Sequence, residues 1–171
     1  MDNEGLLVSE RIKEIMMMCA RENPVYEQIS SFSIALYTLG HFDCPDLMSF
    51  QDVDAQEATK ILNEKFIPVR PEDLPPDYNI TESRERYLLV IGDPLFPLHF
   101  AVLTDILNAR PFFSKLPHFG SGFDSLPELM EEFTRGNGLR PPDIHYFKLN
   151  QNIEMPLTFE RGKIYIVKDS Y

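Results

Sequence analysis

The sequence has few of the features that mark secreted, disulfide-bonded or membrane-spanning chains. It has no Trp and two cysteines, Cys19 and Cys44, which are too few for a disulfide framework. It contains no run of about 18 apolar residues, so no membrane span is predicted. The amino-terminal stretch "MDNEGLLVSERIKE" lacks a basic start followed by an apolar run. We therefore expect no signal peptide and a cytoplasmic location.

Positive charge is also scarce. Lys and Arg number 16 against 27 Asp and Glu, which gives a net charge of −11. The basic residues occur singly, so direct binding of nucleic acid is disfavoured, because phosphate contacts need Lys and Arg. The segment from Asp43 to Glu85 carries eleven acidic and four basic side chains. If a protein partner with a basic surface exists, we expect it to bind this segment, and the alternative is a solvated face.

Catalytic and cofactor-binding motifs are absent. The chain has no Gly-x-Ser-x-Gly elbow, no Gly-x-x-x-x-Gly-Lys-Ser/Thr loop and no Gly-x-Gly-x-x-Gly fingerprint. No catalytic residue and no cofactor is predicted. This absence favours a protein-interaction or regulatory module, such as an inhibitor, an immunity-like protein or an adaptor, over an enzyme.

The residues that are present predict an α+β fold. Hydrophobic residues make up 43% of the 171 residues and include 13 Phe, enough for one good core. Helical spacing predicts three helices first: one capped by Ser9, one running from Pro24 to Leu39, and one starting near Asp54. Strand-forming runs then predict a mostly antiparallel sheet, interrupted by one helix. The predicted strand segments are 86–92, 98–106, 111–116, 143–150 and a hairpin at 157–169.

The predicted organisation has three parts. Residues 1–66 form a helical subdomain, residues 67–83 a proline-rich connector, and residues 84–171 a β-rich α+β subdomain. Four prolines in the connector exclude a continuous helix. We expect the three parts to make one compact unit, and a homodimer is compatible with the sequence.

The stretch "FGSGFDSLPELMEEF" raises the question of a phosphate loop. Ser125 and Glu128 form a capping-box pattern, which would satisfy the first N–H groups of the following helix. Acidic residues along that helix would repel a phosphate. We therefore interpret Gly120-Ser121-Gly122 as a structural turn.

Two candidate sites follow from the remaining polar and aromatic residues. A small-molecule or enzyme pocket is the alternative function, between the helical layer and the sheet near Gly120–Gly122, with candidate binding residues His99, Lys115, His118, Phe119, Ser121 and Phe123. His41 and Cys44 have metal-compatible spacing but would need two further ligands, and a polar loop is the ordinary interpretation. Phe112 and Phe113 point to opposite faces of a strand, so both are buried only if a second layer covers the sheet.

Overall fold

The computed structural model describes residues 3–21, 23–24, 28–42, 44, 46–47 and 49–151. The helices in these residues are α1 (Asn3–Met18), α2 (Ser31–Thr38), α3 (Ala55–Lys65) and α4 (Leu126–Arg135), with a short 3-10 helix η1 (Pro71–Asp73). The strands are β1 (Cys19–Ala20), β2 (Asn23–Pro24), β3 (Phe66–Val69), β4 (Tyr87–Asp93), β5 (Phe96–Leu103), β6 (Phe112–Lys115), β7 (Ser121–Asp124) and β8 (Ile144–Leu149). The predicted hairpin at 157–169 lies outside the described residues.

The strands form one sheet in the order β2-β1-β7-β6-β5-β4-β8-β3. All neighbouring pairs are antiparallel except β1 and β7, which are parallel and joined at Ala20 and Ser121. Three helices precede most of the sheet and a fourth is inserted within it. The prediction of an α+β fold with an amino-terminal helical layer is therefore confirmed.

Side-chain caps fix where the helices begin. Asp54 accepts a 2.8 Å hydrogen bond from the Glu57 N–H at the start of α3. Ser125 and Glu128 form the predicted capping box at the start of α4, each accepting from the other's backbone N–H. Ser30 caps α2 by accepting from the Ser33 N–H at 3.0 Å.

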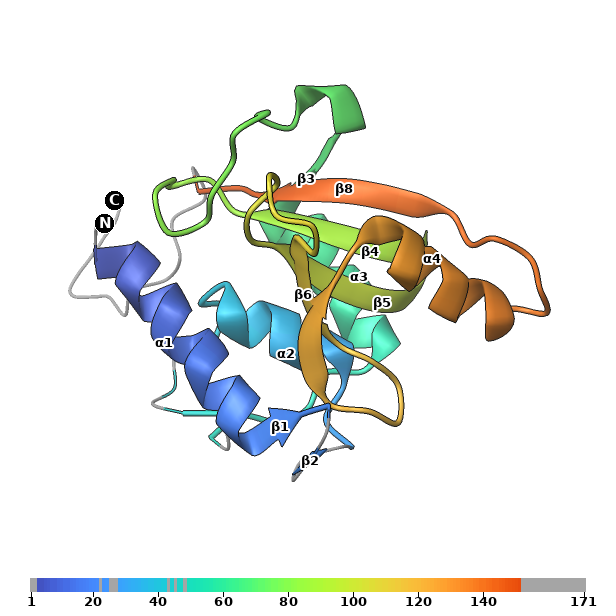
Figure 1. Cartoon of the computed structure of the whole chain (residues 1–171), viewed down its shortest axis with the longest axis horizontal. Helices are drawn as coiled ribbons and strands as arrows, with labels where there is room; N and C mark the ends of the chain where they lie inside the picture. The colour runs from blue at the N-terminus through green and yellow to red at the C-terminus, as the bar shows by residue number, and fades with distance from the viewer. Residues whose placement is uncertain are drawn as a thin grey trace.

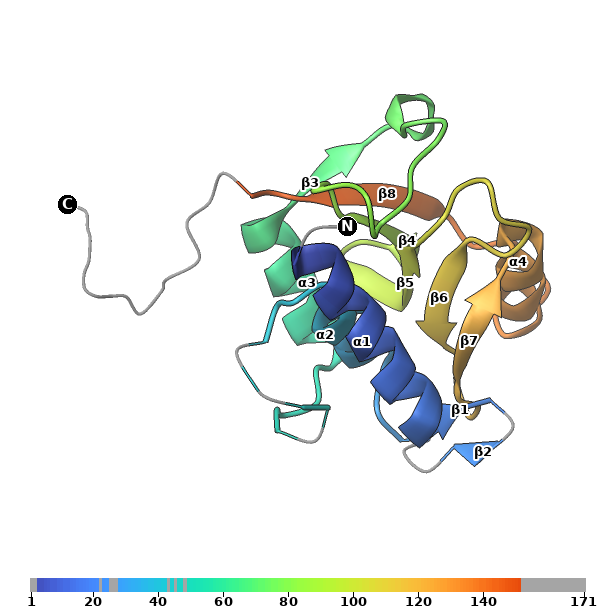
Figure 2. The ribbon, with the colours of Figure 1, turned by 60° about the vertical axis from the view of Figure 1, so that its left-hand side comes forward.

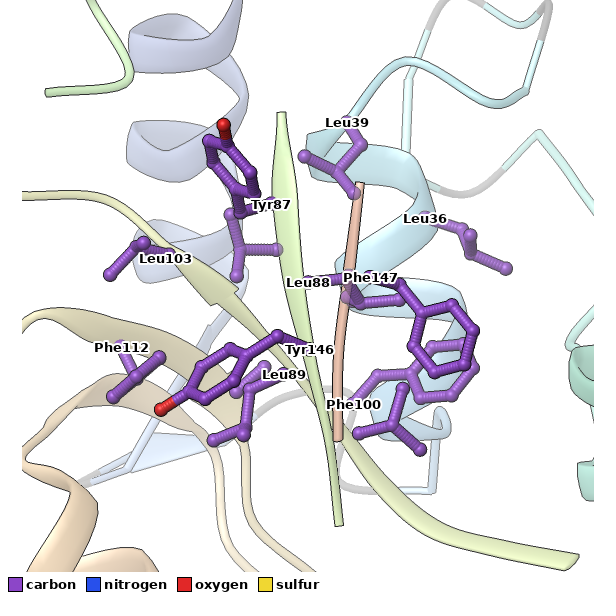
Figure 3. Close-up of a cluster of buried hydrophobic side chains, with 14 of the residues drawn as sticks. Leu36, Leu39, Tyr87, Leu88, Leu89, Phe100, Leu103, Phe112, Tyr146 and Phe147 are labelled. Atoms are coloured by element: carbon purple, nitrogen blue, oxygen red, sulfur yellow. The ribbon is translucent and has the colours of Figure 1, made fainter. Parts of the chain in front are cut away.

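Helices cover both faces of the sheet. Figure 2 shows α1, α2 and α3 on one side of the sheet and α4 on the other, and Figure 1 shows α4 lying across β4 and β5. Figure 3 views β4 and β8 edge-on, with Leu88, Phe100 and Phe147 on the α2 side and Leu89 and Tyr146 on the opposite side. Period-two alternation along the strands supplies a separate apolar set to each face.

The two neighbouring phenylalanines of β6 are both buried. Phe113 is fully buried with Ile15 of α1 and Ile34 of α2. Phe112 lies on the other face, where its ring centroid is 6.5 Å from that of Tyr146. A second layer thus covers the sheet. The sequence analysis required such a layer if both rings were to be buried.

The first two helices differ from their predicted limits. Helix α1 begins at Asn3 rather than after Ser9, because Val8 is buried and extends the apolar face by one turn. The predicted helix start at Pro24 is wrong, since Asn23–Pro24 pairs as β2 and α2 begins at Ser31. Tertiary pairing with β1 outweighs the local helix-start signal of a proline.

The proline-rich connector is more structured than its composition suggests. It starts in β3, whose Pro68 is tolerated because β3 is an edge strand. Farther along, Tyr78 and Ile80 are buried, and the Tyr78 ring meets that of Tyr87 edge-on. The boundaries 1–66, 67–83 and 84–171 stay a prediction, but the sheet takes strands from all three ranges.

None of the helices within the described residues has both the length and the apolar character needed to cross a membrane.

Candidate functional site

The β4–β5 hairpin ends in a firmly held tip. Gly92 has φ of +96° and lies where the β4–β5 register shifts, so the strand bends there. The Thr59 hydroxyl of α3 donates to the Pro94 carbonyl at 2.9 Å. The Asp93 carboxylate accepts from the Leu95 N–H at 2.9 Å. These bonds hold the tip in place although its apolar side chains are exposed.

A second ordered loop follows α4. The Leu139 N–H donates to the Thr134 carbonyl at 2.9 Å, and the Asn137 amide donates to the Arg140 carbonyl at 3.1 Å. Gly138 and Leu139 have φ of +64° and +65°. A positive φ is uncommon for a residue as bulky as leucine. The loop therefore keeps Leu139 in a strained conformation with its side chain 77% exposed.

These two segments face each other across a cavity of about 570 Å³, which we call the hairpin groove. It is lined by Gly92, Asp93, Phe96, Leu98, Asn137, Leu139, Arg140, Pro141, Pro142 and Asp143. Phe96 is 77% exposed, and Leu98 is also exposed. Large apolar side chains gathered on the surface next to a cavity mark interaction sites more often than scattered ones do.

The charge of the hairpin groove is mixed with an acidic excess. Two carboxylates, Asp93 and Asp143, line it together with one guanidinium, Arg140. The Gly92 N–H donates to the Asp143 carbonyl at 2.8 Å, which ties the two walls together at one end. The groove is thus an apolar surface with acidic edges on backbone that is already ordered.

Two of the six predicted binding residues line a different cavity. Lys115 and His118 border a space of about 530 Å³ beside residues 28–32. Lys115 is almost fully buried as a residue, and its ammonium donates to the Leu116 carbonyl at 3.2 Å. At the start of α2, the Asp52 carboxylate already accepts from the Ser30 N–H at 3.1 Å. An anionic group of the protein therefore occupies that helix end.

The other four predicted binding residues are dispersed. His99 lies on the opposite face of the sheet, fully buried beneath Phe133 of α4. Ser121 is buried and pairs with Lys115 across β6 and β7. Phe123 packs on Phe113 with ring centroids 5.1 Å apart, and Phe119 is half exposed. The structure does not bring the six residues into one site.

Ser121 and Gly122 belong to strand β7, and Gly120 lies directly before it, so the segment is mostly strand and not the turn itself, which corrects the sequence interpretation. The turn is closed by the Phe119 N–H bonding to the Leu116 carbonyl at 3.1 Å. A Cβ on Gly120 would lie 2.0 Å from the Ala20 carbonyl oxygen. The glycine is needed because β1 approaches β7 closely, and its backbone pairs with protein rather than cradling a phosphate.

The proposed metal pair remains incomplete. His41 lines a cavity of about 480 Å³ together with Asp52, Asp54 and Glu57. Burial lowers the pKa of His41, and Lys65 lowers it further. The Cys44 thiol donates to the Asp46 carbonyl at 3.4 Å. Within the described part of the chain, no group of three or more His, Cys, Asp or Glu could hold a metal ion.

Sequence reasoning missed the hairpin groove. The segment "DPLFP" joins the predicted strands 86–92 and 98–106 as a turn, and it places Leu95 and Phe96 at an exposed tip. Two apolar side chains in a turn of this kind were the available signal. The pairing with Leu139 could not be found, since these segments are more than forty residues apart and meet only because α4 crosses the sheet.

Comparisons with known proteins give little guidance. No family model matches the chain, and no solved structure matches it. A flavin-containing monooxygenase, ustF2 of Aspergillus flavus, is 26% identical over 140 residues, which is 80% of this chain. The chain spans only 25% of that protein. This similarity is too low to assign the chain to a family.

Proposed function

We propose that the protein is a protein-interaction module and that the hairpin groove is its docking surface. The observation that carries this proposal is the pair of highly exposed apolar side chains, Phe96 and Leu139, on opposite walls of one cavity. Both walls are held by backbone hydrogen bonds. Little conformational entropy is therefore lost when a partner binds, which favours affinity.

The partner is a protein segment with an apolar side chain next to a Lys or Arg. The apolar side chain would insert between Phe96 and Leu139, where burial removes apolar surface from water on both partners. The basic side chain would meet Asp93 and Asp143. The net charge of −11 supports the same choice, because it accelerates association with a basic partner and slows association with an acidic one.

The acidic segment from Asp43 to Glu85 is part of this proposal as a source of long-range attraction. Its exposed Arg70 is already paired with Asp73 at 3.1 Å. We place the protein in the cytoplasm, acting without nucleic acid and without a cofactor, as a regulatory or adaptor component. A homodimer through the hairpin groove is an alternative arrangement that light scattering would detect.

A random linear peptide library displayed on phage tests the proposal without a known partner. We expect selection on the purified protein to enrich peptides that carry an aromatic or aliphatic residue adjacent to Lys or Arg. Their affinity should fall about tenfold or more in Leu139→Gly, since one apolar contact of this kind contributes about 1.5 kcal/mol or more.

The matched control is Leu107→Gly. Leu107 is 75% exposed, like Leu139, but lies in another loop outside the hairpin groove. Glycine accepts the backbone conformation of Leu139, so Leu139→Gly should not destabilise the fold. Selection of peptides without the apolar and basic pattern, or equal binding by both variants, would reject the hairpin groove as the docking surface.

The alternative function, a small-molecule-binding domain or enzyme, is supported by the cavity next to Lys115 and His118. A thermal-shift screen against metal ions, nucleotides and carboxylate metabolites separates it from the first proposal. Stabilisation by one ligand class that is lost in His118→Ala would favour it. A flat response across all classes would count against it.

A further inference from the structure

His99 is a buried polar residue that the proposed docking function does not use. It lies in the middle of β5, is fully buried, and its ring centroid is 4.6 Å from that of Phe133 on α4. Neither imidazole nitrogen has a hydrogen-bond partner among the described residues, and the same is true of the buried Ser114 hydroxyl. Unpaired polar atoms in an apolar layer make this contact between α4 and the sheet costly.

The charges around His99 oppose its protonation. Burial lowers the pKa of His99 to about 3, and the cations Arg21 and Lys115 contribute to the shift. The Asp124 carboxylate of β7 is held by Arg21 through two hydrogen bonds, one of them 2.8 Å long. It is therefore already engaged and cannot turn to an imidazolium without giving up Arg21.

The remaining elements around His99 provide no counter-ion either. Across the ladder to β4, His99 pairs with Ile91. On α4 the titratable groups are in surface ion pairs, which join Glu128 to Arg110, and Glu131 and Glu132 to Arg135. No described element around His99 thus offers a free counter-ion, so protonation of His99 beneath a closed α4 is unfavourable. Protonation becomes favourable only when α4 moves away.

His99 and the hairpin groove share the same two elements. Phe96 and Leu98 of β5 form one wall, and the next residue along the strand is His99. Helix α4, which covers His99 through Phe133, leads directly into the loop that carries Leu139. Moving α4 off the sheet would therefore displace the second wall of the groove.

We propose that His99 is an acid-sensitive latch, such that its protonation stabilises a state in which α4 has left the sheet and the hairpin groove has lost one wall. The first part of this proposal stands on the packing around His99 alone. The effect on docking rests on the proposed function of the groove. Above neutral pH the latch keeps α4 closed, and it weakens as the pH falls.

The size of the effect follows from proton linkage. In the open state His99 would titrate near the ordinary histidine pKa of about 6.5, whereas the closed state stays neutral at pH 5 because its pKa is about 3. The open state therefore gains a proton that the closed state lacks, and lowering the pH favours opening. Between pH 7 and pH 5 the ratio of open to closed molecules should rise about 25-fold.

Hydrogen exchange of the backbone amides tests this directly. Protection factors, corrected for the intrinsic pH dependence of exchange, are measured for α4 and for the buried strand β4 at pH 7 and pH 5. We expect the α4 factors to fall about 25-fold in the wild-type protein and to lie well below those of β4 at both pH values, because β4 exchanges only through global unfolding. Global unfolding also exposes His99, so the β4 factors fall by a similar ratio from a higher starting value. Unchanged protection in α4, or α4 and β4 factors that are equal at both pH values, overturns the proposal.

Variants identify the titrating group. His99→Leu and His99→Gln remove the proton-binding group, and both should abolish the pH effect on α4. If circular dichroism shows that one variant does not fold, the other variant alone is sufficient for the test. If neither folds, the wild-type exchange measurement at pH 7 and pH 5 tests the proposal. His145→Gln is the matched control, since His145 is exposed on β8, and it should behave as wild type. A pH effect that persists in the His99 variants overturns the proposal.

The docking experiment separates the two proposals. A phage-selected peptide that binds at pH 7 and is lost in Leu139→Gly supports the groove as a docking surface. Failure to obtain such a peptide rejects the docking function but leaves the exchange result on α4 unaffected. If α4 shows no pH-dependent exchange but the peptide still binds the groove, only the inference about His99 is rejected.

Discussion

Replacing Gly120 by Ala provides a sharp test of how this sheet is assembled. A Cβ at position 120 would lie 2.0 Å from the Ala20 carbonyl oxygen, 2.2 Å from its carbonyl carbon and 2.5 Å from the Cys19 oxygen. All three are backbone atoms, so no side-chain rotation relieves the clash. Strands β1 and β7 would have to separate by about 1 Å or more to reach ordinary contact distances.

The cost of this separation can be estimated. Overpacking of a tight site costs about 1–3 kcal/mol, and the shift also disturbs the pair between Ala20 and Ser121. We expect Gly120→Ala to lower the free energy of unfolding by about 3 kcal/mol. In a chain of this size that corresponds to a fall in Tm of about 6–12 °C.

Gly122→Ala, two residues farther along and within β7, is the matched control. Its Cβ would lie 3.2 Å from the Arg21 guanidinium, a side-chain contact that a shift of a few tenths of an ångström relieves without moving the backbone. Alanine also recovers about 0.5–1 kcal/mol that glycine loses in a strand, so the net change should be within about 1 kcal/mol. Urea unfolding followed by circular dichroism measures both variants. Equal stability of the two, or greater damage by Gly122→Ala, would refute the close approach of β1 to β7.

Three further predictions use the same urea titrations. Phe113→Ala should cost about 3–5 kcal/mol because Phe113 is fully buried, whereas Phe119→Ala should change stability by less than about 0.5 kcal/mol. Asp124→Asn should cost about 1–2 kcal/mol, since it removes the charge opposite Arg21 in a largely buried ion pair. A double variant with Arg21→Met should show a smaller loss than the sum of the two single losses. Ser125→Ala should cost about 1 kcal/mol and accelerate amide exchange in the first turn of α4.

Local signals predicted much of this fold correctly. The capping pairs at Asp54 and Ser125 located the starts of α3 and α4, because a side-chain cap is a short-range interaction that leaves a sequence pattern. The apolar run at 86–92 became β4 for a similar reason. Strands β1, β2, β3 and β7 were not predicted, since they are only two to four residues long and most of them pair with partners far away in the chain.

The candidate site was much harder to predict. His99, Lys115 and Ser121 were grouped from their proximity in the sequence, but alternation along β5 and β6 sends His99 to the α4 face and Lys115 to the α2 face. The hairpin groove depends on the contact between a β-hairpin and the loop after α4. Nothing local to Phe96 or Leu139 encodes that contact, although Pro94-Leu95-Phe96-Pro97 places apolar residues between two predicted strands.

The two proposals are linked by one measurable quantity, the ratio of open to closed molecules at pH 7. The apparent affinity of a partner that binds only the closed groove is proportional to the closed fraction of molecules. A 25-fold rise in the open-to-closed ratio therefore matters only if opening is already appreciable at pH 7. With about 4% open at pH 7, roughly half of the molecules would be open at pH 5, and the affinity would fall about twofold. With 0.01% open, the affinity would stay constant although α4 exchange still accelerates. The α4 protection factor at pH 7 thus predicts the pH dependence of docking. The open-to-closed ratio obtained from α4 exchange sets the largest expected loss of peptide affinity between pH 7 and pH 5. A larger loss would mean that acid acts on the groove through a group other than His99.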